Sequence, residues 1–422
     1  MKLVVRPSSI EGAIPSSPSK SYTHRAMVLA LLADGRSTLR NALISGDTLA
    51  TLRAIQQLGG DVKVKGDVCM VRGGELICPE DVIDAENSGT TIRLIAGVAS
   101  LLPCTTVLTG DESIRQRPMQ PLIDALVELG VQCASLEADG KAPLVLHGPN
   151  EGKTAHIRGD VSSQFISSLI ISSPVKEVDT DVVLTTPLKS RPYIDITLEM
   201  IGEFGAECEV LEDSFHIPGR QFYNPIEYVI PGDYSSAAFP LVAGAIAGSA
   251  SVDGLDPKDK QGDKRVVEIL KDFGARIDST GGRMSASSER LRAREVDLAD
   301  SPDLFPIVCV LATQAKGRTR IYNAEHVRLK ESDRIQSTTA FLRMMGAEVK
   351  ETKDGCVVDG PCKLKGAEVE SLGDHRILMA AAVAALVADG ETVISDGECY
   401  KISYPSFVQD MRALGANMEM IE

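Results

Sequence analysis

The sequence predicts a mixed α/β fold of two similar domains, each built from three β-α-β-α-β-β units. Two periodic features indicate this architecture. A Gly-, Ser- or Asp-rich turn opens into a small-residue apolar helix six times, at intervals of roughly seventy residues. An amphipathic helix that closes on an apolar residue and Gly recurs six times at the same interval. Because two independent markers share one spacing, the chain contains six repeats of one supersecondary unit.

The first helix of each unit is expected to be buried. Its residues are small and apolar nearly all round, without the polar stripe that faces water. These helices begin at Ser19, Ser88, Asp160, Gly232, Ser301 and Gly373. A β-branched strand is predicted after each helix, as in segments 36–42, 104–110 and 318–324.

The second helix of each unit is amphipathic and is expected to be partly exposed, as in segments 48–60 and 265–275. The Gly that follows is a natural C-cap, because its left-handed backbone carries no Cβ penalty. These glycines are Gly59, Gly130, Gly205, Gly274, Gly346 and Gly415. Short alternating strands complete each unit, as in segments 61–73 and 142–148.

Six units divide better into three plus three than into a solenoid. Solenoid repeats run to about 20–45 residues, shorter than these. We place one domain at residues 1–13 plus 231–422, holding units four to six. The other domain is 14–230, holding units one to three. The strand predicted at 1–7 is expected to pair with the last unit, so the chain crosses between domains near residues 13 and 230.

Composition narrows the possible partners. The 422 residues are 43% hydrophobic and 24% charged, ordinary values for a globular protein. Aromatic residues make up only 4%, Trp is absent, and the net charge is −15, which argues against nucleic acid and against an anionic membrane surface. No uninterrupted apolar run reaches membrane-spanning length. An anionic substrate would therefore need a local cluster of Lys and Arg.

The nine cysteines predict reduced thiols in a cytoplasmic protein. They are scattered, form no Cys-x-x-Cys pair, and are odd in number, so a complete disulfide framework is impossible. The N-terminal segment lacks the long apolar core of a signal peptide. The six histidines include no pair at metal-binding spacing, so no metal site is expected.

The starts of five buried helices carry groups suited to anions. Free N–H groups and the helix dipole favour negative charge there. Capping alone explains any single helix start, but charged side chains on several nearly apolar helices are costly without a common pocket. The fourth start, residues 232–239, carries no such group and is expected to be purely structural. The candidates at the other starts are Lys20, Ser21, Arg25, Asn87, Gly89, Ser162, Ser163, Gln164, Asp303, His375 and Arg376.

Four further segments carry candidate residues. They contribute Arg117, Ser190, Tyr193, Lys330, Glu331, Arg334 and Lys401. Segment 329–335 has an alternative interpretation as an exposed helix with pairs of opposite charge. Asp303, Glu331 and His375 are the proton-transfer candidates, because their side chains can exchange a proton within an anion site.

With these residues in place, the chain resembles the 5-enolpyruvylshikimate-3-phosphate synthases (3-phosphoshikimate 1-carboxyvinyltransferases). Nine motifs stand in family order over nearly the whole chain: PSKSYTHR, ENSGTTIR, RQRPM, GDVSSQF, SRPYID, SPDLF, LKESDR, GDHR and a late Lys. The resemblance implies transfer of the enolpyruvyl group of phosphoenolpyruvate to the 5-hydroxyl of shikimate 3-phosphate. It implies no metal or organic cofactor, and two domains with the active site in the cleft between them.

The resemblance also implies a role for each matched residue. Shikimate 3-phosphate would contact Lys20, Ser21, Arg25, Ser162, Ser163, Gln164, Ser190, Tyr193, Asp303 and Lys330. Phosphoenolpyruvate would contact Lys20, Asn87, Gly89, Arg117, Gln164, Glu331, Arg334, His375, Arg376 and Lys401. Asp303 matches the acceptor of the 5-hydroxyl proton. Glu331, with Lys20 or Lys401, matches the group that protonates the methylene carbon, and His375 matches a supporting position.

Three alternatives remain open. His326 stands where some members have Asn, and Asn323 lies three positions earlier, so either residue could contact shikimate 3-phosphate. The runner-up function is enolpyruvyl transfer to UDP-N-acetylglucosamine, although the loop before Pro118 lacks the Cys usual in that sister enzyme. A non-catalytic anion-binding scaffold would leave Asp303 and Glu331 unexplained, because their charges repel anions. The expected partners are the two small substrates, with the protein a monomer.

Overall fold

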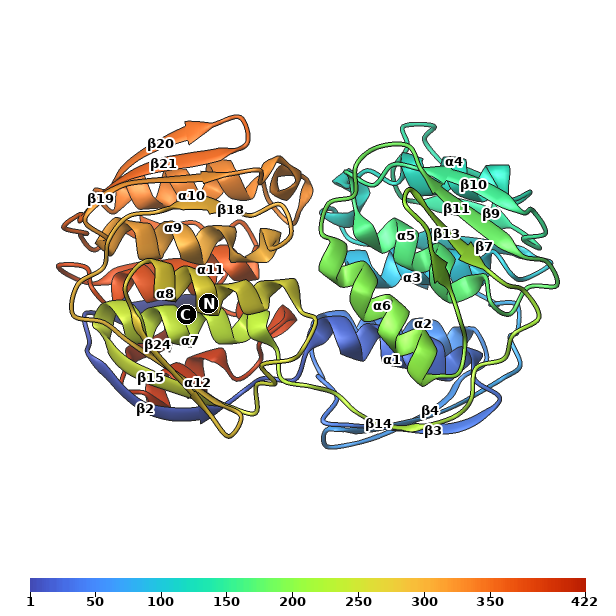
Figure 1. Cartoon of the computed structure of the whole chain (residues 1–422), viewed down its shortest axis with the longest axis horizontal. Helices are drawn as coiled ribbons and strands as arrows, with labels where there is room; N and C mark the ends of the chain where they lie inside the picture. Colours follow the sequence, from blue (N-terminus) through green and yellow to red (C-terminus); the bar gives the residue numbers. More distant parts are fainter. The chain divides into compact units, whose positions relative to one another are not determined.

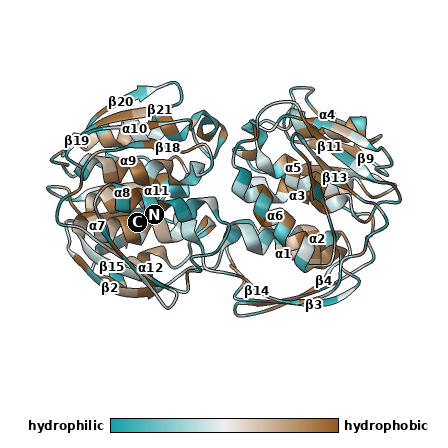
Figure 2. Cartoon of the chain, viewed as in Figure 1, coloured by the Kyte–Doolittle hydropathy of each residue, from teal (hydrophilic) through white to brown (hydrophobic).

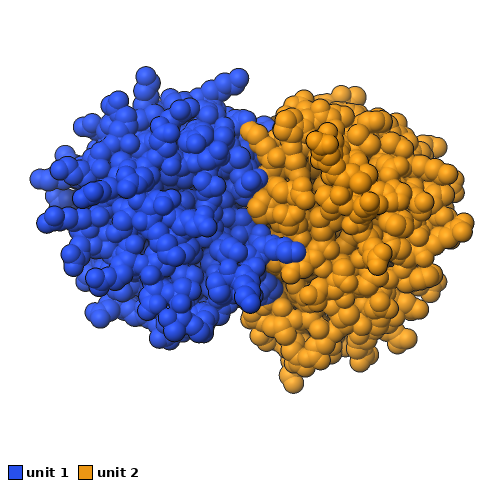
Figure 3. All heavy atoms as spheres, in the orientation of Figure 1, with its two compact units in different colours: residues 1–17, 231–422 blue, residues 18–230 orange.

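The computed structural model describes all residues, 1–422. The chain forms two compact units, shown in separate colours in Figure 3. Unit 1 comprises Met1–Ser17 and Pro231–Glu422, and unit 2 comprises Pro18–Ile230. Each unit contains three four-stranded sheets and the helices between them (Figure 1).

Unit 2 holds the sheets β14-β3-β5-β4, β6-β7-β9-β8 and β10-β11-β13-β12. Its helices are α1 (Lys20–Leu32), α2 (Gly46–Gln57), α3 (Gly89–Ala99), α4 (Gln120–Glu128), α5 (Ser163–Ser172) and α6 (Arg191–Glu203), with a 3₁₀ turn η1 (Ile114–Gln116). Its strands are β3 (Gly35–Arg40), β4 (Asp61–Lys65), β5 (Val68–Gly73), β6 (Ile83–Asp84), β7 (Thr105–Thr109), β8 (Gln132–Ser135), β9 (Leu144–His147), β10 (Thr154–Ile157), β11 (Thr180–Leu184), β12 (Glu209–Val210), β13 (Ser214–Ile217) and β14 (Glu227–Val229).

Unit 1 holds the sheets β16-β17-β15-β2, β18-β19-β21-β20 and β22-β23-β1-β24. Its helices are α7 (Tyr234–Ala247), α8 (Val266–Asp272), α9 (Phe305–Gln314), α10 (Arg334–Met344), α11 (His375–Ala385) and α12 (Phe407–Ala413), with 3₁₀ turns η2 (Gly262–Arg265), η3 (Pro302–Leu304), η4 (Glu325–Leu329) and η5 (Cys399–Ile402). Its strands are β1 (Lys2–Arg6), β2 (Ile10–Pro15), β15 (Gly248–Asp253), β16 (Arg276–Thr280), β17 (Arg283–Ser287), β18 (Glu295–Asp297), β19 (Gly317–Tyr322), β20 (Glu348–Thr352), β21 (Gly355–Gly360), β22 (Glu368–Val369), β23 (Thr392–Ile394) and β24 (Asn417–Ile421).

The sheets share one topology, which confirms the predicted fold class. In the second repeat, β6 runs parallel to β7, and β9 pairs antiparallel with both β7 and β8. The terminal strand β1 lies antiparallel between β23 and β24, with Val4 opposite Val393 and Glu419. The prediction that segment 1–7 pairs with the last unit is therefore confirmed.

The small-residue helices form the cores of the units, as predicted. Every residue of α3 and α11 is buried. Figure 2 shows hydrophobic colouring on the core helices, for example α7 and α9. The six glycines predicted as C-caps all have positive φ, from 84° at Gly346 to 107° at Gly59. None of the helices combines the length and the apolarity needed to cross a bilayer.

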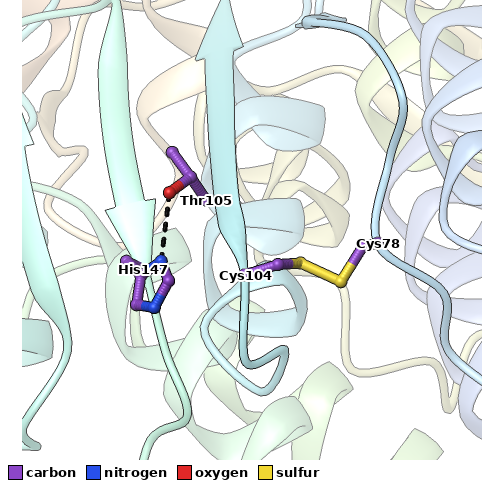
Figure 4. The surroundings of a disulfide bond; sticks show 4 residues. All are labelled: Cys78, Cys104, Thr105 and His147. Atoms are coloured by element: carbon purple, nitrogen blue, oxygen red, sulfur yellow. Dashed lines mark hydrogen bonds between the residues drawn. A yellow bond between two sulfur atoms is a disulfide. The ribbon is translucent and has the colours of Figure 1, made fainter.

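The prediction of reduced thiols is wrong for one pair of cysteines. Cys78 and Cys104 form a disulfide, with their Cα atoms 6.2 Å apart (Figure 4). Cys78 lies in the loop after β5, and Cys104 immediately precedes β7, whose Thr105 hydrogen-bonds to His147 at 3.0 Å. The spacing could not predict this bond, because packing between two successive repeats brings the thiols together. The other seven cysteines are free.

Candidate functional site

A cluster of alternating charges surrounds Arg334 in unit 1. Its guanidinium donates to Asp303 at 2.7 Å, to Asp374 at 2.8 Å and to Glu331 at 2.5 Å. Arg334 is only 1% exposed. Burial lowers its pKa, but these three carboxylates outweigh burial and raise the pKa overall. Three carboxylates around one buried guanidinium form a network that is costly to break at any single member.

Asp303 is the most heavily ion-paired carboxylate of this cluster. Besides Arg334, it accepts from Arg376 at 2.9 Å and lies 4.0 Å from the Lys330 ammonium. Burial alone would raise the pKa of Asp303, but Arg376, Lys330 and Arg334 outweigh it and hold the pKa well below the usual range. Asp303 is therefore a very weak base while both guanidinium groups remain in place.

Local structure positions these groups at helix starts. Asp303 lies in the turn η3 that leads into α9. Asp374 caps α11 by accepting from the backbone N–H of Arg376 at 2.9 Å, and Asp333 caps α10 through Gln336 at 3.0 Å. The caps thereby fix the backbone position of Arg334 and Arg376, which lie in the first turns of α10 and α11.

Sequence reasoning missed Asp263, which lies close enough to Asp303 to interact with its charge. Burial and the Asp303 charge raise the pKa of Asp263 to about 7, although Arg376 and Ser235 oppose them. Its carboxylate accepts a hydrogen bond from Ser235 at the start of α7. The fourth helix start, predicted to be purely structural, therefore supports a buried carboxyl beside the cluster. The only sequence signal for this residue is that Asp263 is an acidic residue in the first turn of η2.

One predicted residue of unit 1, Lys401, is not part of the ion-paired group. Lys401 pairs with Glu398, and its side chain is 52% exposed. His375, the first residue of α11, is buried.

Asn323 donates its side-chain amide to Asp297 at 2.8 Å, whereas His326 is buried. Which of these two residues contacts substrate stays a prediction.

In unit 2, Lys20 and Arg25 occupy different environments on α1. The Lys20 ammonium donates to Asp47 at 2.7 Å, a partner that sequence reasoning missed. Arg25 is 1% exposed, and its guanidinium donates to Thr197 at 2.8 Å and to the carbonyl oxygens of Ser21 and Tyr193 at 3.0 and 3.1 Å. Burial lowers the pKa of Arg25 to about 10. In this structure Arg25 therefore fixes the backbone of Ser21 and Tyr193 through their carbonyl oxygens.

Helices α3 and α5 contribute a second polar group. The side chain of Gln164 accepts from Arg93 at 2.6 Å and donates to Thr90 at 2.8 Å. Gly89 begins α3, where a Cβ atom would lie 2.7 Å from Nη1 of Arg117 and 3.3 Å from that of Arg93. The absence of a side chain at this position allows two guanidinium groups to approach the helix N-terminus.

The remaining predicted residues of unit 2 lie at turns. Ser162 caps α5 by accepting from the backbone N–H of Gln164 at 3.3 Å, and Ser163 is buried beside it. Ser190 precedes α6 with φ of 56° and accepts from the backbone N–H of Tyr193 at 3.1 Å. Asn87 donates to Asp111 at 2.6 Å.

The two units therefore present different chemistry. Unit 1 gathers Asp303, Lys330, Glu331, Arg334 and Arg376 into one ion-paired cluster. Unit 2 presents hydroxyl, amide and cationic groups around the starts of three buried helices. No group of three or more His, Cys, Asp or Glu side chains is arranged to hold a metal ion. Such an arrangement suits anionic ligands with several hydroxyl or phosphate oxygens.

Known proteins resemble this chain over its full length. The family model described as EPSP synthase (3-phosphoshikimate 1-carboxyvinyltransferase) matches residues 4–411. The chain is 50% identical to the 3-phosphoshikimate 1-carboxyvinyltransferase of Methanocorpusculum labreanum and 44% identical to that of Methanocaldococcus jannaschii. Each match covers 99% of this chain and 99% of the relative. The EPSP synthase of Acinetobacter baumannii superposes with a TM-score of 0.82 at 27% identity, covering 100% of both chains.

These relatives do not favour the runner-up family that acts on UDP-N-acetylglucosamine, because the matching family and curated relatives carry the 3-phosphoshikimate description. Together with the shared six-repeat architecture, the full-length matches establish the family. The chain belongs to the EPSP synthase (3-phosphoshikimate 1-carboxyvinyltransferase) family.

Proposed function

We propose that this protein transfers the enolpyruvyl group of phosphoenolpyruvate to the 5-hydroxyl of shikimate 3-phosphate. The 5-hydroxyl oxygen bonds to C2 of phosphoenolpyruvate while C3 gains a proton, which gives a tetrahedral intermediate. Phosphate then leaves C2 and C3 loses a proton, which restores the double bond. This reaction places the protein in the shikimate pathway towards chorismate and aromatic amino acids.

The observation that carries this proposal is the pairing of Asp303 with Arg334 and Arg376. Both guanidinium groups are assigned to phosphoenolpyruvate, whose phosphate and carboxylate are stronger partners than one shared carboxylate. Substrate binding would draw these cations from Asp303 and so raise its pKa. Asp303 becomes a competent base for the 5-hydroxyl proton only when the second substrate is bound.

Glu331 is the proposed proton donor to C3 of phosphoenolpyruvate. In the structure the Glu331 carboxylate accepts a hydrogen bond from the Arg334 guanidinium at 2.5 Å. Movement of Arg334 to phosphoenolpyruvate would therefore affect Glu331 as well as Asp303. Lys20 or Lys401 would assist it, as the family pattern implies, and His375 would support the phosphate end. The remaining cations would stabilise charge on the departing phosphate.

The groups of unit 2 are proposed to hold shikimate 3-phosphate. Ser21, Ser162, Ser163, Gln164, Ser190 and Tyr193 offer hydrogen bonds, and Lys20 offers charge. Arg25 contributes through the carbonyls of Ser21 and Tyr193 that it fixes. Because unit 1 supplies the acid–base groups, we propose that the two units act as the two domains of one enzyme. Both would contribute contacts to the same pair of substrates.

Phosphate release from phosphoenolpyruvate tests this function directly. The purified protein should release phosphate with shikimate 3-phosphate and not with UDP-N-acetylglucosamine; the opposite preference would refute the proposal. In Asp303→Ala, kcat should fall by about three orders of magnitude or more while shikimate 3-phosphate still binds. Asp272→Ala, which removes an exposed carboxylate at the end of α8, is the matched control for a lost carboxylate. Full turnover by Asp303→Ala would remove Asp303 from the mechanism.

We also propose that the protein is a cytoplasmic monomer. One chain carries both groups of site residues, and seven of its cysteines are free thiols. Light scattering should return a mass near the 45.1 kDa of one chain. A dimer mass that persists on dilution would contradict the monomer.

A further inference from the structure

Unit 2 contains a cavity of about 790 Å³ at the carboxyl ends of α1, α3 and α5, which are labelled in Figure 1. Leu32, Leu101, Val175 and Tyr223 are among its lining residues. The candidate site residues of these helices stand at their opposite, amino-terminal ends. The volume lies within the range of small-molecule pockets, and nothing in the proposed transferase mechanism uses this cavity.

The walls of the cavity are held by bonds to the helix ends. Gly74 donates its N–H to Leu31 at the end of α1 at 3.0 Å, and Asn150 donates to Ser100 after α3 at 2.8 Å. Gln221 donates to Pro174 after α5 at 2.8 Å. The Cys78–Cys104 disulfide ties the loop after Gly74 to the segment after α3 (Figure 4). The cavity is therefore preformed within the fold of unit 2.

One lining residue of the cavity is Lys176, a buried lysine whose ammonium has no carboxylate partner. Lys176 is 4% exposed, and its Nζ donates to the Gly152 carbonyl at 2.7 Å and to the Thr180 hydroxyl at 2.8 Å. Both acceptors are neutral, and one of the three donors remains available. Burial lowers the pKa of Lys176 to about 8. An uncompensated buried cation beside a cavity is the feature expected of a group that meets an anionic ligand.

Two unpaired carboxylates border the same cavity. Glu151 directly precedes Gly152, the residue that binds Lys176, and Asp34 follows the end of α1. Both residues are exposed, and neither carboxylate has a hydrogen-bond or ion-pair partner; Asp34 donates only its backbone N–H, to the Tyr223 carbonyl at 3.3 Å. The carboxyl ends of the three helices add partial negative charge. The lining therefore contains residues of both signs of charge, the cation of Lys176 and the carboxylates of Glu151 and Asp34.

An exposed aromatic ring completes the lining. Phe222 is 79% exposed, the highest value among the large hydrophobic residues, and it stands beside the buried Tyr223. Exposed apolar surface next to a cavity is typical of a binding site. A ligand with an apolar body would cover this ring and the aliphatic wall near Leu101.

We propose that this cavity binds a free α-amino acid with an apolar side chain. Its carboxylate would meet Lys176, its ammonium would meet Glu151 and Asp34, and its side chain would lie against Phe222 and the aliphatic wall. A purely anionic or purely cationic ligand would leave one set of charges unmatched. The two charges of an α-amino acid match the two signs of charge in the lining, and an apolar side chain matches its aliphatic and aromatic residues.

Calorimetric titration of the purified full-length protein tests this proposal, with L-phenylalanine, L-tyrosine and L-leucine as probes. At least one should bind saturably with Kd of about 1 mM or tighter. Phenylacetate and phenethylamine, which each retain one of the two charges, should bind at least tenfold more weakly than L-phenylalanine. Saturating shikimate 3-phosphate, added without phosphoenolpyruvate so that no turnover occurs, should not displace the amino acid. Displacement would place it in the transferase site and refute the proposal.

Variants locate the binding within the cavity. Lys176→Met and Glu151→Gln should each weaken binding at least tenfold, whereas the matched control Lys153→Met, a lysine outside the lining, should not. Glu151 is exposed, so its variant keeps the test valid if Lys176→Met fails to fold. The absence of saturable binding by all three amino acids, or unchanged binding in Glu151→Gln, would overturn the proposal. These measurements do not require turnover, so they are independent of the proposed function.

Discussion

Replacement of Asp263 by Asn should stabilise the protein most at alkaline pH. Asp263 is 1% exposed, and burial together with the charge of Asp303 raises its pKa to about 7, against 3.8 for an ordinary Asp. The folded state therefore keeps a proton that the unfolded state releases. Stability contributed by this group is present at low pH and is lost as pH rises from 3.8 to about 7.

The expected magnitude follows from the difference between these two pKa values. A difference of this size corresponds to about 4 kcal/mol once both states are ionised, above pH 7. Asn resembles the protonated carboxyl and can still accept from Ser235, the donor to Asp263. Asp263→Asn should therefore gain up to about 4 kcal/mol over the parent at pH 8 and only about 1–2 kcal/mol at pH 5.

Urea unfolding followed by circular dichroism, at pH 5 and at pH 8, measures this difference. Asp272→Asn, which removes an exposed carboxylate at the end of α8, is the matched control and should show no comparable change with pH. If Asp263→Asn unfolds at lower urea than the parent at pH 8, the carboxylate is stabilising there. That result would refute the reasoning, as would a gain that is equal at both pH values.

Three further predictions concern unit 2. Gly89→Ala should raise KM for phosphoenolpyruvate about tenfold and leave that for shikimate 3-phosphate within twofold, because a Cβ would lie 2.7 Å from Nη1 of Arg117; equal changes in both KM values would contradict this. Arg25→Lys should destabilise the protein by about 2–4 kcal/mol in urea unfolding, because one ammonium cannot replace a fork that donates to Thr197 and two carbonyls; a loss below about 1 kcal/mol would show that the bonds contribute little. Cys78→Ser should lose about 3–4 kcal/mol, since the disulfide closes a loop with a separation of 26 residues, and reductant should lower the parent to the same level; a parent insensitive to reductant would refute the cross-link.

Local sequence patterns predicted the repeated elements well. The core helices are recognisable because small apolar residues surround them, and the glycines that end the second helices are recognisable because only Gly accepts that backbone cheaply. Pairing of the N-terminal strand with the last repeat was also predicted, from the position of segment 1–7 before the first unit. These features depend on residues that are neighbours in the chain or that recur with a fixed period.

Features that depend on contacts between repeats were not predictable in the same way. The Cys78–Cys104 bond, the Lys20–Asp47 pair and the approach of Asp263 to Asp303 each join residues of different elements. Arg25 was assigned to the ligand by its motif, yet its guanidinium reaches inward to α5 and α6. Nothing in the spacing of these residues states which way a side chain turns once helices pack.

The sequence by itself determined the six-repeat architecture, the family and the residue types gathered at the helix starts, because these follow from local propensity, hydrophobic period and motif order. Only the tertiary structure decided the electrostatic state of those residues. Asp303 is a strongly paired anion and Asp263 a carboxyl with a pKa of about 7, although both are aspartates at buried turns. The difference arises because burial penalises either charge. Arg376, Lys330 and Arg334 outweigh this penalty at Asp303, whereas Arg376 offsets it only in part at Asp263.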